Sequence, residues 1–186
     1  MKIRLAKIED AVQLVEIYRP YVEHTAITFE YETPSIEQFQ QRMVSIQSKY
    51  PYLVCEVDDE IVGYAYANTF KPRAAYDWCV EVTIYLKQNC RGRGIGKALY
   101  VKLEEVLRRM HFTNMCACIT YTDHEDEYLK NESMKFHEAM GFSLVGQFHN
   151  CGYKFDRWYH MIWMEKMINS HTKGMCKVMD IQEVEV

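Results

Sequence analysis

The spacing of apolar and polar residues in the first third of the chain predicts one strand and two helices. Residues 2–5 alternate between apolar and polar and indicate a short strand. Apolar residues at helical spacing follow over residues 11–22, and Pro20 should kink or end that helix. A second helix is predicted over residues 34–50, where Ser35 has the spacing of a capping box with the Gln three residues later.

The apolar period then changes to two, which is typical of strands. Strands are predicted over residues 52–57, 61–70, 80–86, 115–121, 144–148 and 158–164. An amphipathic helix is predicted over 95–110, and a short helix over 133–140 that Gly141 should end. The order β-α-α-β-β-β-α-β-α-β-β predicts a mixed α/β domain with one central sheet. We expect a single domain at residues 1–168 and a C-terminal tail at residues 169–186, where the periodicity is lost.

Composition narrows the class of protein. The chain has 186 residues, of which 48% are apolar and 13% aromatic, so it can bury a core and is not disordered throughout. The net charge of −4 argues against a nucleic-acid-binding protein. No apolar run approaches the roughly 20 residues of a membrane span, so we expect no membrane partner. The seven cysteines form no CxxC pair and the chain begins with charged residues, which together favour a reducing cytoplasm and no metal site.

A glycine-rich basic loop lies between a predicted strand and the helix over 95–110. The loop contains Arg91, Gly92, Arg93, Gly94, Ile95 and Gly96. Helix starts carry unpaired N–H groups and a positive partial charge, and glycines let a ligand approach the backbone closely. The loop is therefore predicted to bind a phosphate or diphosphate. It fits neither a Walker loop nor a dinucleotide-binding fingerprint, because the glycines and the residue after Lys97 do not match.

The pattern Arg-x-x-Gly-x-Gly in this loop resembles the acyl-CoA diphosphate loop of the GNAT N-acetyltransferase superfamily. Residues 75–86, 136–142 and 152–158 resemble segments of its phosphinothricin acetyltransferase branch. The resemblance extends from about residue 2 to 166, and residues 76–96 are its most specific part. It implies the GNAT fold and an acetyl-CoA-dependent N-acetyltransferase.

Two residues receive catalytic roles through this resemblance. Glu81 would be the general base that takes a proton from the attacking amine, and burial would raise its pKa toward the working range. Its spacing alone is equally compatible with the solvent face of a strand. His137, four residues before Gly141, would protonate the leaving thiolate of CoA. Orientation of the substrate, or simple packing of the helix, are the alternative roles for His137.

The resemblance also assigns binding residues. Backbone groups of Thr83, Ile84 and Tyr85 would contact the acetyl and pantetheine groups, and Asn131 would contact CoA. For the acceptor, Phe29 would form a wall of the pocket, and Arg73 and Tyr76 would hold the substrate. Arg73 could pair with a carboxylate or an oxyacid through a two-pronged contact.

The resemblance points to a small-molecule acceptor, an amino acid or an analogue such as phosphinothricin or methionine sulfoximine. Homodimers are common in this branch, so a homodimer is expected. Two alternatives share the fold: a protein N-terminal or lysine acetyltransferase, which needs an open peptide groove, and a non-catalytic CoA-binding module. A nucleic-acid module is favoured only by a few clustered Arg and Lys residues, and the net charge argues against it.

Overall fold

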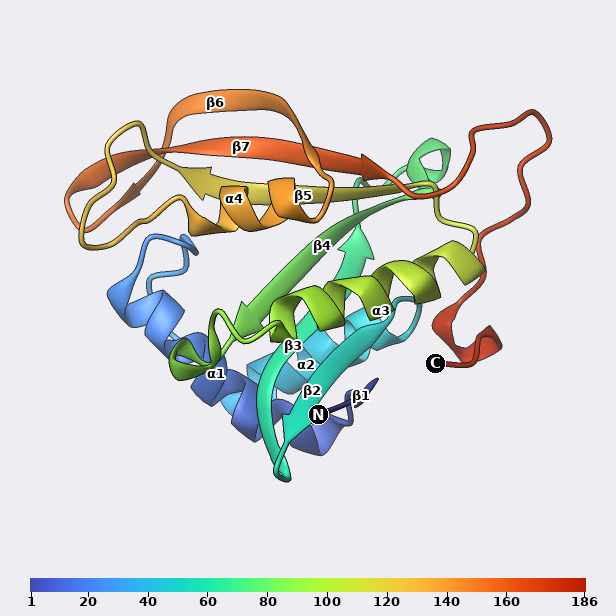
Figure 1. The fold of residues 1–186 in the computed structure, drawn as a ribbon, viewed down its shortest axis with the longest axis horizontal. Coiled ribbons are helices and arrows are strands. Elements are labelled where there is room, and N and C mark those ends of the chain that lie inside the picture. The colour runs from blue at the N-terminus through green and yellow to red at the C-terminus, as the bar shows by residue number, and fades with distance from the viewer.

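One mixed sheet organises the chain in the computed structural model, which describes residues 1–186 (Figure 1). The strands are β1 (Lys2–Leu5), β2 (Tyr52–Val57), β3 (Glu60–Thr69), β4 (Cys79–Leu86), β5 (Asn114–Tyr121), β6 (Ser143–Lys154) and β7 (Arg157–Met167). Their order in the sheet is β1-β2-β3-β4-β5-β7-β6. All neighbouring pairs are antiparallel except β4 and β5, which are parallel. The predicted mixed α/β class and element order are confirmed.

Helices cover both faces of this sheet. They are α1 (Ala11–His24), α2 (Ile36–Gln47), α3 (Ile95–Arg109) and α4 (Glu132–Ala139). The α1–α2 pair packs on one face, and α3 with α4 lies on the other (Figure 1). Apolar side chains from both layers form a core of 41 buried residues around the sheet. None of the helices has the length and apolar composition that crossing a bilayer would require.

Local signals set several helix ends. The Oγ of Ser35 accepts a hydrogen bond from the Gln38 N–H (3.2 Å), and the Gln38 side chain accepts one from the Ser35 N–H (2.9 Å). This is the predicted capping box. Gly141, directly after the C-cap of α4, has φ +86°, as a helix-ending glycine requires.

Pro20 does not end α1, contrary to one of the two outcomes expected from the sequence. The helix continues through it to His24. Proline inside a helix costs about 3 kcal/mol. The last turn nevertheless buries Tyr21 and Val22, at 4% and 1% exposure, and the burial of two such side chains offsets that cost.

Two segments near the C-terminus differ from what apolar periodicity predicted. Strand β6 extends to Lys154, well past the predicted end at 148, because it pairs with β7 across a register irregularity between Phe148 and Gly152. The segment over 169–186 packs against the domain, with Val178 and Ile181 buried. The Ile181 N–H donates to the Lys49 carbonyl (3.0 Å), so the segment adds to the same core.

The feature that positions the site is the separation of β4 from β5. The two parallel strands are paired only as far as Glu81 and Cys116. Both strands continue beyond these residues, to Leu86 and Tyr121, and diverge in Figure 1. The unpaired stretch leaves a wedge in the middle of the sheet, with backbone groups of β4 along its side.

Candidate active site

A cavity of about 250 Å³ occupies the wedge between β4 and β5. Among the residues that line it are Phe29, Glu81, Thr83, Ile84, Tyr85 and His137. The structure therefore brings together both proposed catalytic residues, the three proposed backbone contacts and one proposed substrate residue. These residues come from the segment after α1, from β4 and from α4, which are far apart in the sequence.

Glu81 is the last residue of β4 that pairs with β5, and its side chain is half-buried. Loss of water around the carboxylate raises its pKa above the ordinary value for Glu, and the positive charge of Lys71 partly opposes this shift. A carboxylate with a raised pKa is a stronger base at neutral pH. The position and chemistry of Glu81 suit the removal of a proton from an amine in the cavity.

His137 is buried, with 3% of its surface exposed, and both ring nitrogens are engaged. Its Nδ1 lies 2.7 Å from the Ser133 carbonyl oxygen, which can only accept, so Nδ1 carries the proton. The Nε2 atom therefore accepts a hydrogen bond from the Tyr100 hydroxyl (2.9 Å). Burial lowers the pKa of His137 to about 4, so the imidazole is neutral at pH 7.

Tyr100 is a cavity residue that the sequence analysis missed. It belongs to α3, it lines the same cavity as Glu81, and burial raises the pKa of its hydroxyl. Its position in the helix matched the apolar stripe, so periodicity indicated only a core residue. Only the contact between α3 and α4 shows that its hydroxyl meets His137.

A second cavity, of about 460 Å³, lies over the glycine-rich loop. Its lining includes Arg91, Gly92, Gly94, Ile95, Gly96 and Lys97. Gly92 and Gly94 have φ +71° and +79°, conformations that favour glycine, and Gly94 is the N-cap of α3. The cavity thus combines a helix N-terminus with two cationic side chains, which fits a diphosphate.

The loop side chains differ in their surroundings. Arg91 forms an ion pair with Glu132 (2.9 Å) and lies over the ring of Tyr21, 5.3 Å from its centroid. Arg93 does not line this cavity, although the sequence placed it in the diphosphate loop. Of the three loop cations, only Arg91 and Lys97 line this cavity.

The two cavities adjoin each other. Ile27, Ile84 and Ser133 line both. A long ligand that is anchored at the loop can therefore extend along β4 and end beside Glu81. That path suits a coenzyme with a charged diphosphate at one end and a reactive group at the other.

Three proposed contacts lie apart from these cavities. Arg73 and Tyr76 are exposed in the loop before β4, where Tyr76 packs edge-on against Phe70. The Asn131 amide is paired with the backbone of Thr122 through both its oxygen and its nitrogen (3.2 and 2.8 Å). Roles of these three residues in binding stay predictions.

Lys154 fixes the segment that carries Phe29. Its ammonium is buried and donates hydrogen bonds to the carbonyls of Val22, Thr25 and Thr28, at 2.7, 2.9 and 2.8 Å. Gly152 leaves room for the Phe29 ring, because a Cβ at this position would lie only 2.1 Å from it. The end of β6 therefore holds the Phe29 wall of the Glu81 cavity in place.

A helix N-terminus for a diphosphate, joined to a wedge with a basic carboxylate, is the arrangement expected of an acyl-CoA-dependent transferase. Residues 3–163 match a family model described as the acetyltransferase (GNAT) domain. The chain therefore belongs to the GNAT acetyltransferase family. The expected fold and the expected class of enzyme, an N-acetyltransferase, are confirmed.

The chain is also similar to individual members of this family. It is 30% identical over 159 residues to a phosphinothricin N-acetyltransferase of Streptomyces viridochromogenes, covering 86% of this chain and 83% of the relative. An L-methionine sulfoximine/L-methionine sulfone acetyltransferase of Salmonella typhimurium is 27% identical over 176 residues, covering 92% and 97%. The crystal structure of a GNAT superfamily phosphinothricin acetyltransferase from Sinorhizobium meliloti in complex with acetyl-CoA superposes with a TM-score of 0.82. That protein is 32% identical, and the match covers 94% of each chain.

Proposed function

We propose that this protein uses acetyl-CoA to acetylate the amine of a small molecule, an amino acid or an analogue of the phosphinothricin or methionine sulfoximine type. The observation that carries the proposal is the continuity of the two cavities, which joins the anion-binding loop to Glu81. The names of the relatives support the choice of acceptor.

In this proposal the loop holds the diphosphate through Arg91, Lys97 and the first N–H groups of α3. Bound acetyl-CoA supplies a thioester as the electrophile. The other edge of β4 is paired with β3, but the edge that faces the wedge has no strand partner beyond Glu81, and backbone groups on this edge over Thr83, Ile84 and Tyr85 would contact the acetyl and pantetheine portions. The wedge keeps these groups beside Glu81.

Glu81 takes the proton that the acceptor ammonium must lose before nitrogen can attack. As the tetrahedral intermediate collapses, the C–S bond breaks and the leaving thiolate takes the remaining proton of the former ammonium nitrogen. His137 is neutral, with its Nδ1 proton bound by the Ser133 carbonyl, and it accepts the Tyr100 hydrogen bond at Nε2, so in this proposal the two side chains shape the cavity wall and His137 does not act as an imidazolium acid.

The setting of the enzyme is part of the same proposal. All seven cysteines are free thiols, which supports a reducing, cytoplasmic compartment. A homodimer follows from the resemblance to the phosphinothricin acetyltransferase branch. We propose residues 1–168 as the catalytic domain, with the C-terminal segment packed against it.

The test is release of free thiol from acetyl-CoA with phosphinothricin, methionine sulfoximine, polyamines and short peptides as acceptors. We expect turnover with the amino-acid analogues, and Glu81→Gln should lower kcat by about 10²–10⁴-fold while acetyl-CoA affinity is retained. Glu105→Gln, on the exposed side of α3, is the matched control. Unchanged turnover in Glu81→Gln would remove its role as base, and turnover only with peptides would favour a protein acetyltransferase.

The pH dependence gives a second readout. The deprotonated carboxylate is the active form, so kcat/KM should rise with pH through a pKa above the ordinary value for Glu. Glu81→Gln should abolish this rise. A rise that persists in the variant would assign the titration to another group.

A further inference from the structure

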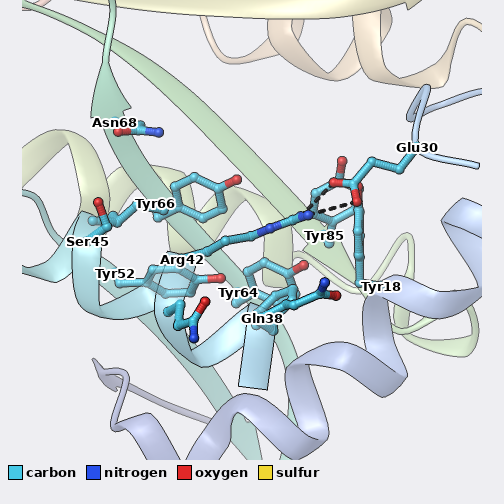
Figure 2. A pocket seen from close by; sticks show the side chains of 13 residues that line it. Tyr18, Glu30, Gln38, Arg42, Ser45, Tyr52, Tyr64, Tyr66, Asn68 and Tyr85 are labelled. Carbon is cyan, nitrogen blue, oxygen red and sulfur yellow. Dashed lines mark hydrogen bonds and ion pairs between the residues drawn. The ribbon is translucent and has the colours of Figure 1, made fainter. Parts of the chain in front are cut away.

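A third cavity, of about 570 Å³, lies between α2 and the sheet, on the face that carries Glu81. Figure 2 shows the side chains that line it. In the β3–β4 register Asn68 is opposite Glu81, and Tyr66 is opposite Thr83. Because alternate residues share a face, these side chains project from the same side of the sheet as Glu81. Tyr66 and Tyr85 line both this cavity and the Glu81 cavity, so the two adjoin.

Phenol hydroxyls converge on this cavity. Tyr52 and Tyr64 are only 2% and 1% exposed, yet their hydroxyls make no hydrogen bond within the chain. The structure has no fully buried side-chain oxygen without a hydrogen-bond partner. The two hydroxyl oxygens therefore have some accessible surface, and this surface faces the cavity that the two residues line. Burial raises the pKa of Tyr52, Tyr64 and Tyr85, which keeps these groups protonated as hydrogen-bond donors.

One guanidinium faces the same space. Arg42 of α2 crosses the cavity between the rings of Tyr66 and Tyr64 and ends at Glu30 (Figure 2). Glu30 accepts two hydrogen bonds from Arg42, at 2.6 and 3.0 Å. Both side chains are partly exposed, at 48% and 34%, so a competing anion can reach the pair. The guanidinium and the free phenols together make a donor-rich site, and Glu30 is the single carboxylate in its lining.

We propose that this cavity binds an oxyanion carried by the acceptor at the end distant from its amine, such as a phosphinate, carboxylate or sulfonate. Arg42 exchanges the Glu30 carboxylate for the ligand, and the hydroxyls of Tyr52 and Tyr64 donate to the remaining oxygens. The acceptor nitrogen then lies in the adjoining cavity beside Glu81. This inference rests on the proposed acetyltransferase function and adds the residues that select the acceptor.

Phosphinothricin and L-methionine sulfone form a matched pair of probes, because they share one skeleton and differ in the charge of the distal group. The readout is the ratio of kcat/KM for phosphinothricin to kcat/KM for the sulfone. Arg42→Gln should lower this ratio by about tenfold or more, the factor expected for one charge-assisted hydrogen bond. Glu30→Gln should raise it, because it frees Arg42 for the ligand. Arg19→Gln, an exposed arginine of α1, should leave it unchanged.

The hydroxyls are tested without changing the rings. Tyr52→Phe combined with Tyr64→Phe should raise KM for phosphinothricin severalfold while kcat and the KM for acetyl-CoA stay near wild type. Arg42→Gln and Glu30→Gln should change the ratio of kcat/KM values in opposite directions. If the ion pair were only structural, breaking it by either substitution would change this ratio in the same direction.

Failure of this inference can be told apart from failure of the proposed function. A ratio that Arg42→Gln leaves unchanged, including equal losses for both acceptors, overturns the distal oxyanion site while turnover itself upholds the acetyltransferase. If no acceptor is turned over, calorimetric binding of phosphinothricin in the presence of CoA decides. Binding that Arg42→Gln weakens supports the site, and absence of binding or equal binding overturns it.

Discussion

Replacement of Lys154 by Met should destabilise the protein and loosen the acceptor side of the active site. The ammonium donates three hydrogen bonds, at 2.7–2.9 Å, to carbonyls at the end of α1 and in the segment after it. With 3% of the residue exposed, water cannot replace these bonds unless the structure opens. Burial also lowers the pKa of Lys154, so part of the hydrogen-bond energy is offset by the cost of desolvating the charge.

The magnitude follows from these contacts. A hydrogen bond to a charged group contributes about 1.5–3 kcal/mol, and three of them, less the desolvation cost, leave a net loss of about 3 kcal/mol. For a chain of this size 1 kcal/mol corresponds to about 2–4 °C, so the Tm should fall by about 6–12 °C. Met fills a similar volume, so the loss reports the hydrogen bonds and not a cavity.

The assay combines thermal unfolding with kinetics. The segment that Lys154 holds leads to Phe29 and Glu30 and contributes only Ile27 to the cavity over the glycine-rich loop, so KM should rise more for the acceptor than for acetyl-CoA. Lys135→Met, on an exposed side chain of α4, is the control and should change neither quantity. A Tm within 2 °C of wild type would show that the three bonds contribute little to the free energy of unfolding, and would refute the reasoning.

Three further predictions test other parts of the structure. Arg91→Ala should weaken acetyl-CoA binding, measured by calorimetry, and this loss of affinity should be smaller at high salt. Arg93→Ala should have a clearly smaller effect, because the Arg93 side chain does not line the cavity over the glycine-rich loop. Tyr100→Phe removes the partner of the buried His137 Nε2 and should lower the free energy of urea unfolding by about 1–3 kcal/mol; no loss would mean that Nε2 finds another donor. Deletion of residues 170–186 removes the buried Val178 and Ile181 side chains and exposes the surface that they cover. It should lower the free energy of urea unfolding by about 3–6 kcal/mol. Wild-type stability after that deletion would show that the segment packs without contributing to the core.

Features that depend on neighbouring residues could be read from the sequence. Apolar periodicity gave the element order, since one face of each element must be buried. The Ser35 cap, the glycine after α4 and the loop before α3 are equally local, because each needs a few residues with particular backbone angles or side-chain donors. Resemblance to a family added Glu81 and His137, which spacing alone left open between a functional and a structural role.

Contacts between distant segments were decided by the tertiary structure. Periodicity could not show that β4 and β5 separate beyond Glu81, or that Tyr100 of α3 meets His137 of α4, because neither depends on local spacing. Arg42 matched an exposed helical position, and only the packing of α2 over the sheet brings it to the tyrosines. Pro20 is a further example, because burial of the side chains that follow it outweighed the tendency of proline to end a helix. Helix and strand propensities are set within a few residues, whereas a binding site is made by side chains that only the folded chain brings within hydrogen-bonding distance.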